Sequence, residues 1–429
     1  MLLWWALGCA AQKKVDAPHA AADERVAAER ELLVWKVHKP GVSPSYLMGT
    51  CHLQVPLARW LPPPHDGALD GSRVVYTEIG DEPIDIMALF ELIPVRDTSL
   101  RDEIGQVAFD EVSRSMREVM PASMLDVLPT WIAFSMLDLE ELGRRFTALN
   151  EPGHVLLDRA VVLRAGDRGI EVRALETIDS QIALFSRFES VFEQALDSSS
   201  DVASRSKEQM NNVVELCSTF EVANVEASLA EHDPTGFVDA LLGERNRTWM
   251  VALRPELERG GVFVAVGAAH MLGTDGLIAG MEADGFTVER LVGRSTPPVA
   301  ATYVPPPTTT PPGPADPELA GHWARVMSAD TQPSLCAADG LLRTCFGLDE
   351  TSCANEMDRA AEMCVAQQGD RLPPPGVQLD PQMGTEIGAC MPAGIVFRGI
   401  VSGEMGDAPM CDMIRTAMQE ATNALMGGM

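Results

Sequence analysis

Two segments far apart in this chain share one pattern, a hydrophobic strand that runs into a Gly-x-x-His motif. Residues 32–37 and 46–48 are apolar and are separated by KPGVSP, which predicts a β-hairpin whose second strand ends in GTCH, residues 49–52. Later in the chain, GVFVAV (residues 261–266) predicts a buried strand, and GAAH (residues 267–270) follows it. A single motif of this kind is a common coincidence, in which a histidine merely ends a strand. Its recurrence predicts that both strands lie in one sheet and that His52 and His270 converge.

Two further predicted strands end in a carboxylate. Residues 73–79 (RVVYTEI) contain Glu78, and residues 169–175 (GIEVRAL) are followed by Glu176. A lone glutamate is usually solvated or paired with an arginine, but in this position it could also bind a cation or act as a base. The intervening segments show helical periodicity, including an amphipathic helix over residues 237–258. The sequence therefore predicts an α/β fold with a mixed central sheet and many flanking helices.

Composition and charge limit the possible partners. The 429 residues are sufficient for two or three domains, and 46% hydrophobic with 22% charged residues is typical of a folded soluble protein. A formal charge of −29 argues against binding to nucleic acid or to an anionic membrane surface. The sequence contains no run of about 20 apolar residues, so it predicts no membrane-spanning helix. Contact with a membrane is expected only through a lipid anchor.

The N-terminus predicts such an anchor. Residues 1–11 (MLLWWALGCAA) have the form of a short bacterial lipoprotein signal, in which Cys9 would carry the lipid. The apolar stretch is short and no basic residue precedes it, so a coincidental cysteine is the alternative. We expect a signal over residues 1–9, a tether over residues 10–30, and an exported protein on the periplasmic face or the cell surface of a bacterial envelope.

The C-terminal region differs from the rest of the chain. Residues 295–320 are rich in Pro and Thr and predict an extended linker. Residues 321–429 contain an even set of cysteines, which predicts three disulfides with fifteen possible connectivities in a small helical module. A metal site is the alternative, but no CxxC pair or histidine cluster supports it. The cysteines of this region are Cys336, Cys345, Cys353, Cys364, Cys390 and Cys411.

Several motifs in the same order resemble the TraB/PrgY/GumN family, whose relatives include the TIKI proteins. They are YLMGTCH, the strand that ends in Glu78, LDRAVVLRAGDRGIEVRALETIDSQ, ERNRTWM and VAVGAAHMLGTDGL, and together they span residues 31–294. The resemblance implies an EreA/ChaN-like α/β fold with two GxxH motifs and a glutamate around one site. TIKI members are described as divalent-cation-dependent proteases, and PrgY-like members are linked to inhibition of peptide pheromones. The lipoprotein-like start and the C-terminal region depart from the family pattern.

The resemblance carries roles onto particular residues. His52 and His270 are the motif histidines, Glu78 is the strand-end glutamate, and Arg245 with Asn246 forms the arginine–asparagine pair. Glu176 and Gln181 belong to the Leu-Glu-Thr…Gln signature. His52, Glu78 and His270 would form an open three-ligand site for Mn, Co or Zn, with rings and carboxylate within about 5–8 Å of one another.

This donor set predicts hydrolysis of a peptide or protein substrate. A cation would acidify a bound water, Glu176 would be the general base, and Arg245 would stabilise an oxyanion or a substrate carboxylate. No HExxH or GxSxG motif supports a helix-borne zinc site or a serine nucleophile. A surface protein that sequesters peptides without cleaving them, and a structural envelope lipoprotein, are the alternatives. We expect His270 to lie at the sheet edge and to add little packing, and Cys51 to point to the opposite face from His52.

Overall fold

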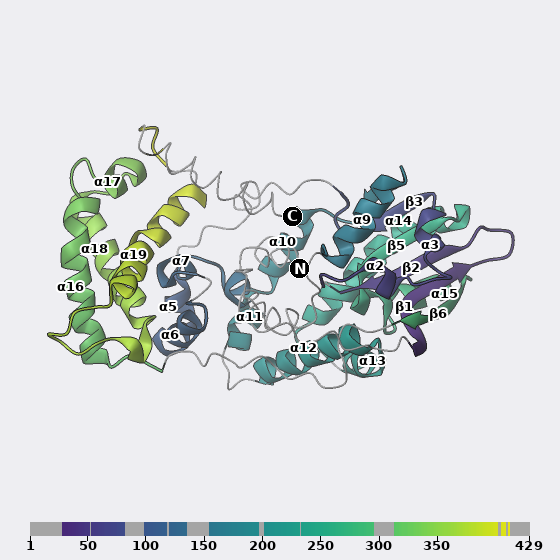
Figure 1. Ribbon diagram of the computed structural model, residues 1–429, viewed down its shortest axis with the longest axis horizontal. Helices are drawn as coiled ribbons and strands as arrows, with labels where there is room; N and C mark the ends of the chain where they lie inside the picture. The colour runs from purple at the N-terminus through teal and green to yellow at the C-terminus, as the bar shows by residue number, and fades with distance from the viewer. Residues whose placement is uncertain are drawn as a thin grey trace.

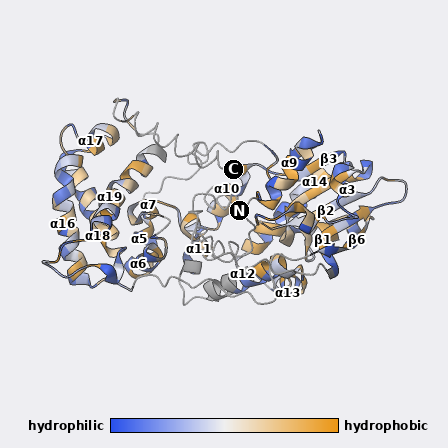
Figure 2. Cartoon of the chain, in the orientation of Figure 1, coloured by the Kyte–Doolittle hydropathy of each residue, from blue (hydrophilic) through white to orange (hydrophobic). Residues whose placement is uncertain are grey.

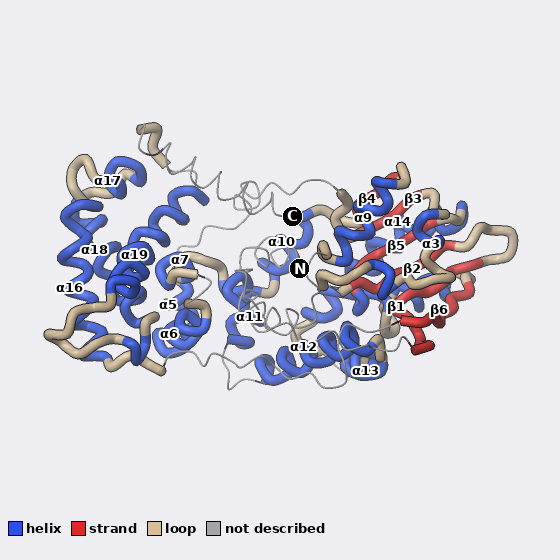
Figure 3. The backbone as a smooth tube through the Cα atoms, in the orientation of Figure 1, coloured by secondary structure: helices blue, strands red, loops and turns tan. Residues whose placement is uncertain are grey.

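The predicted hairpin lies inside a six-stranded sheet at one end of the molecule (Figures 1 and 3). The computed structural model describes residues 28–51, 53–81, 98–117, 120–134, 154–196, 201–231, 233–295, 313–401, 405–408 and 411. In spatial order the strands are β4 (Glu171–Ala174), β3 (Val74–Thr77), β5 (Val262–Gly267), β2 (Ser45–Thr50), β1 (Ala28–His38) and β6 (Thr287–Ser295). β4, β3, β5 and β2 are parallel, whereas β1 pairs antiparallel with both β2 and β6. The predicted mixed sheet is confirmed.

The turn of the hairpin follows directly from its sequence. The amide of Val42 donates to the carbonyl of Lys39 at 3.1 Å, and Gly41 between them has a φ of +79°. A proline followed by a glycine with positive φ is the arrangement of a type II turn. The turn sets the register in which Val34 faces Met48 and Val37 faces Ser45.

Helices pack against the sheet to form the first hydrophobic core. This core includes the fully buried Leu47, Phe263 and Trp249, and the strands read as almost continuous hydrophobic runs because the parallel part of the sheet is covered. The elements of this unit besides the strands are α2 (Leu57–Trp60), α3 (Gly67–Asp70), α9 (Leu157–Asp167), α12 (Asp201–Thr219), α13 (Ala223–Leu229), η1 (Asp239–Glu244), α14 (Arg245–Arg259), η2 (Ala268–Met271) and α15 (Leu277–Ala283).

A second hydrophobic core lies at the other end of the molecule, and the colouring of Figure 2 shows hydrophobic residues in both units. It joins residues on the two sides of the predicted Pro/Thr-rich linker. From before the linker come α5 (Leu100–Ile104), α6 (Gln106–Ser115), α7 (Ala122–Leu125), α10 (Ile178–Arg187) and α11 (Glu189–Leu196). From after it come α16 (Pro317–Leu335), α17 (Leu341–Phe346), α18 (Glu350–Ala366), η3 (Gly369–Arg371) and α19 (Pro381–Val401).

The helix ends of the second unit agree with their sequence. Asp316 and Asp349 precede α16 and α18, and each carboxylate accepts the backbone N–H three residues later, as N-caps do. α16 also begins with Pro317, a residue that is favoured in the first helical turn. Among the described residues, no helix is both long enough and apolar enough to cross a bilayer.

Disulfides hold both units. The three pairs of the C-terminal region are Cys336–Cys353, Cys345–Cys411 and Cys364–Cys390. The disulfide-rich helical module that the cysteine count predicts is thus confirmed, and its connectivity is now defined. A fourth bond, between Cys51 and Cys217, was not predicted; it fastens the end of β2 to α12 inside the first core. Cys9, the proposed lipid-bearing residue, lies outside the described residues.

Candidate functional site

The carboxyl ends of the four parallel strands meet along one edge of the sheet. Thr50 of β2 is in register with Gly267 of β5, and Thr77 of β3 is in register with Ala265 of β5 and Ala174 of β4. Glu78, Glu176 and His270 follow three of these ends. β5 lies between β2 and β3, so the order of the strands in the sheet differs from their order in the sequence at this point. In α/β sheets, ligands bind at the carboxyl ends of the strands at such a switch point.

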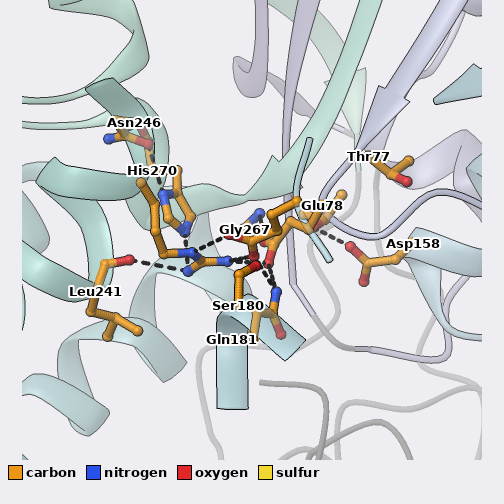
Figure 4. Close-up of polar contacts among 12 residues, drawn as sticks. Thr77, Glu78, Asp158, Ser180, Gln181, Leu241, Asn246, Gly267 and His270 are labelled. Carbon is orange, nitrogen blue, oxygen red and sulfur yellow. Dashed lines mark hydrogen bonds and ion pairs between the residues drawn. The ribbon is translucent and has the colours of Figure 1, made fainter. Parts of the chain in front are cut away.

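Arg245 connects the two glutamates. Its Nη2 donates to Glu78 Oε2 at 2.8 Å and to Glu176 Oε1, and its Nε donates to Glu176 Oε2 at 3.0 Å. The three side chains are only 9–11% exposed, so the ion pairs are shielded from solvent. Figure 4 shows this cluster, in which side chains from different elements point toward one another. Burial alone would lower the pKa of Arg245, but the charges and hydrogen bonds of the glutamates outweigh burial and raise it.

An irregular helix places this guanidinium. The predicted helix over residues 237–258 is a π-helix, η1, that becomes the α-helix α14 at Arg245. Single π-turns of this kind are frequent at functional sites because they redirect a side chain. Arg245 Nη1 donates to the carbonyl of Leu241 within that turn at 3.0 Å, which fixes the side chain from behind.

Glu78 and Glu176 are held from other sides as well. The backbone amide of Gly267 donates to Glu78 Oε1 at 3.0 Å. Gln181 Nε2 donates to Glu176 Oε1, and it lies 3.4 Å from Glu78 Oε2. Gln181 is in the first turns of α10, which Thr177 and Ser180 begin with a reciprocal capping box. The helix therefore presents its positive N-terminal end close to the carboxylates.

His270 is the neutral member of the cluster. Asn246 Nδ2 donates to the carbonyls of His270 and Asp275 at 3.1 and 2.8 Å, so the other atom of that amide, Oδ1, is an acceptor for His270 Nδ1, 2.8 Å away. The proton then lies on Nδ1, and the lone pair of Nε2 accepts from Arg245 Nη1 at 3.0 Å. Burial, together with the charge of Arg245, lowers the pKa of His270 to about 3.

One expectation about His270 is wrong. Instead of adding little packing, it is 1% exposed, and the centroid of its ring lies 4.4 Å from that of Trp249. The reason is that the strand is followed by η2, which folds the histidine back under α14. Trp249 lies one helical turn after Arg245, and its ring is 4.7 Å from the guanidinium carbon. That i, i+4 spacing was the sequence signal for Trp249, which the motif analysis missed.

The two Gly-x-x-His motifs pack against each other where Gly49 of the first meets Ala268 of the second. A side chain on Gly49 would come within 2.9 Å of both Cα and Cβ of Ala268, and the Gly49 carbonyl accepts from Trp60 Nε1 at 2.9 Å. Gly49 is thus required for close packing of β2 on η2. The residues that flank His52 are also held, because Cys51 is disulfide-bonded and Leu53 accepts the amide of Leu157 at 2.8 Å. His52 itself lies outside the described residues.

The cluster contains the donor types that divalent cations bind, carboxylate oxygens and a neutral imidazole, but Arg245 now occupies them. Two carboxylates share one guanidinium, which leaves one formal negative charge in excess, and the neutral imidazole has its lone pair on Nε2. A hydrogen bond from the second ring nitrogen to an amide oxygen is the usual support of a metal-binding histidine. Arg245 now donates to that lone pair and would have to release it. Within the described residues, no three His, Cys, Asp or Glu side chains are arranged around a common metal position.

Comparisons with known proteins give one match. The model of the TraB/PrgY/gumN family matches residues 33–290, which include every described residue of the cluster. No curated protein and no solved structure matches the chain.

Proposed function

Because this chain belongs to the TraB/PrgY/gumN family, we propose that it is an exported, divalent-metal-dependent hydrolase that cleaves peptide bonds. The observation that carries the proposal is the buried Glu78–Arg245–Glu176 cluster beside a neutral His270 at the carboxyl edge of the parallel strands. Hydrolysis of an amide needs a base, a group that stabilises negative charge on the carbonyl oxygen, and an activated water. The cluster has carboxylates that could act as the base and a guanidinium that could stabilise negative charge, within hydrogen-bonding distance of one another; the activated water would come from the bound cation.

In this proposal each residue of the site has a separate role. His52, Glu78 and His270 would hold the cation, which is Mn, Co or Zn. When bound, such a cation acidifies water and polarises a carbonyl. In this proposal Glu176 takes the proton of the attacking water, and Arg245, which now pairs with it, balances the charge that develops on the substrate. Asn246 keeps the proton of His270 on Nδ1, so that the lone pair is on Nε2, and Arg245 would have to release this lone pair before a cation could bind it.

A binding protein without turnover is the second candidate. The observation that favours it is that Arg245 already occupies acceptor atoms of Glu78, Glu176 and His270. A site closed by its own guanidinium could hold a carboxylate or carbonyl of a peptide without activating water. In this second candidate function the protein binds a peptide but does not cleave it.

The proposed location is the cell envelope, with Cys9 as the lipid-bearing residue. Four disulfides support an oxidising compartment, because such bonds are rare in reducing cytosol. The charge of −29 disfavours nucleic acid as a partner and leaves peptides or proteins as the expected ligands.

The experiment uses the full chain in three states: metal-stripped, loaded with Mn, Co or Zn, and loaded in the Glu78→Gln variant. Cation binding is measured by calorimetry, and cleavage of a peptide library by mass spectrometry. The matched control is Glu244→Gln, an exposed glutamate one residue before Arg245. We expect binding and cleavage in the wild type and in the control, and neither in Glu78→Gln. Peptide binding with no cleavage in any metal state would favour the sequestering protein, and cleavage by the metal-stripped chain would overturn metal dependence.

A further inference from the structure

One face of helix α10 contacts the functional site, and its other face packs in the second hydrophobic core. Gln181 Nε2 donates to the carboxylate of Glu176. The next residue, Ile182, is buried in the core that contains the C-terminal helices, and Ile178 and Phe185 of the same helix pack against that core. The position of Gln181 relative to the carboxylates therefore depends on how α10 is held from behind.

Six aromatic rings do much of that holding, and we refer to them as the aromatic cluster. Phe185 of α10 stacks on Trp131 with centroids 5.6 Å apart and an interplanar angle of 12°. Phe237, which lies just before η1, is 5.1 Å from Phe192 in an edge-to-face contact. The cluster thus backs both α10, which carries Gln181, and the segment that leads to Arg245. Its members are Trp131, Phe134, Phe185, Phe188, Phe192 and Phe237.

Polar contacts fasten the same elements. Glu189 accepts the backbone amides of Thr130 and Trp131 at 2.5 and 3.3 Å, so the start of α11 caps the helical turn that carries Trp131. Arg187 at the end of α10 pairs with Glu244 at the end of η1 at 2.7 Å. The exposed pair contributes little to stability, but the capped turn is partly buried and is fixed in place.

Trp131 belongs to a segment that is inserted between β3 and α9. We call residues 98–134, in which 118 and 119 are not described, the insert, and helices α16–α19 the C-terminal bundle. Gln367 of the bundle is 3% exposed and satisfies three backbone groups of the insert: it donates to the carbonyls of Ser113 and Met120 at 2.9 Å each and accepts the amide of Ala122 at 3.1 Å. The Gln367 side chain therefore supplies hydrogen bonds to three backbone groups that burial removes from water.

A glycine lets α7 and α19 approach closely. Ser123 of α7 donates to the carbonyl of Cys390 and accepts the amide of Gly394 at 3.1 Å. A Cβ atom at Gly394 would overlap the carbonyl oxygen of Ser123, so only glycine allows this contact. Arg359 of α18 adds a bond of 3.2 Å to the buried carboxylate of Asp126. The Cys364–Cys390 disulfide links α18 to α19, so the two anchors cannot separate.

We propose that the C-terminal bundle helps to position the functional site. The bundle packs against the insert, and the aromatic cluster links the insert to α10, so that Gln181 is held within hydrogen-bonding distance of Glu78 and Glu176. Close-packed cores transmit displacement because they leave no free volume to absorb it. Gly394 and Gln367 of the bundle contact Ser123 and Ala122 of the insert, and Trp131 of the same insert stacks on Phe185 of α10, the helix that carries Gln181. The proposal does not depend on which reaction the site performs.

The test compares two glycine-to-alanine variants of the full chain. Gly394→Ala places a methyl group against the backbone of Ser123, whereas at Gly388, in the same helix, an added Cβ meets nothing within 4 Å. Amide hydrogen exchange is followed in three segments: the insert, α10, and β1 of the first core. We expect Gly394→Ala to speed exchange about tenfold or more in the insert and in α10, to leave β1 unchanged, and Gly388→Ala to change none of them.

Three results would overturn the proposal. Faster exchange in the insert without any in α10 would show that the bundle docks but does not reach the site. Equal acceleration in β1 would mean general destabilisation, and no change anywhere would mean that the close approach at Gly394 is absent in solution. If Gly394→Ala does not accumulate as folded protein, Gln367→Met is used instead, because it keeps the volume and removes all three polar contacts.

Discussion

Arg245 contacts more of the site than any other described side chain. It donates to both carboxylates and to the imidazole, and its fourth partner is the Leu241 carbonyl of its own helix. A buried charge with this many acceptors cannot be removed without leaving the two buried carboxylates without a compensating positive charge. Its neighbour Arg247, two residues later, pairs with Asp239 and Asp275 at the surface, so the same helix offers an internal comparison.

Replacing Arg245 should therefore destabilise the fold strongly. Arg245→Met leaves two carboxylates buried side by side, and we expect a loss of about 3–5 kcal/mol in the free energy of unfolding. Arg247→Met, whose arginine is 53% exposed, should cost less than about 1 kcal/mol. Urea denaturation of both variants measures the difference. Equal stabilities would show that the ion pairs around Arg245 are not formed in solution.

His270 makes the stability of the protein depend on pH. Its folded-state pKa, about 3, lies below the ordinary value of 6.5, so its contribution is fully present above pH 6.5 and is lost as the pH falls toward 3. The unfolded chain takes up the proton first, which should lower the free energy of unfolding by about 2 kcal/mol between pH 8 and pH 5. His270→Gln removes the titrating group and should flatten this part of the profile, measured by urea denaturation at each pH. Parallel profiles of variant and wild type would contradict the buried neutral imidazole.

At the scale of the element, the end of β2 is the most heavily fastened strand end of the site. Gly49 packs against Ala268, Cys51 is bonded to Cys217 of α12, and Leu53 accepts the amide of Leu157 at the start of α9. Three separate elements thus hold the chain on either side of His52. A motif histidine that is to meet groups from other strands needs this kind of support, since second-layer contacts orient the residues of a site.

Removing the Cys51–Cys217 disulfide should be the most destabilising of the cysteine changes. The bond closes a loop with a sequence separation of 166, against 17 for Cys336–Cys353. Chain entropy predicts about 5 kcal/mol for the long loop and about 3 kcal/mol for the short one. The double variants Cys51→Ala/Cys217→Ala and Cys336→Ala/Cys353→Ala are compared by urea denaturation. A smaller loss for the long loop would show that strain or residual structure, rather than chain entropy, decides the order.

At the scale of the whole molecule, the second hydrophobic core is built from two stretches of chain that lie on either side of the Pro/Thr-rich segment. The second core contains Phe109 and Trp131 from before the Pro/Thr-rich segment and Met357 and Ile387 from after it. A boundary drawn along the sequence at residue 295 therefore cuts through a packed interior. The insert has no other described partner of comparable extent for its apolar side.

A chain that ends at residue 295 should consequently expose that interior. Each side chain such as Leu100, Phe109 or Trp131 that loses its cover forfeits about 1.5–3 kcal/mol, and we expect the fragment 28–295 to bind a hydrophobic dye and to aggregate. Dye fluorescence and sedimentation of the fragment are compared with those of the full chain. A monomeric fragment that binds no dye would show that the insert buries its apolar side without the C-terminal bundle.

The local patterns of the sequence determined the elements and much of the site. Apolar runs and turn residues predicted β1 and the four parallel strands, because side-chain period and turn residues are local properties, and the residues at the strand ends, Glu78, Glu176 and His270, were therefore identifiable. The motifs added Arg245 and Asn246. The even cysteine count of the C-terminal region likewise predicted three bonds, since pairing within a small segment needs no knowledge of the fold.

Only the tertiary structure decided how these parts meet. The strand order places β5 between β2 and β3, and this long-range pairing, which no periodicity encodes, is what brings His270 next to the glutamates. The same holds for the burial of His270 beneath Trp249, for Cys217 as the partner of Cys51, and for the joining of the insert to the C-terminal bundle. Each depends on contacts between residues far apart in the chain, whose cost in chain entropy is met only when the whole core packs together.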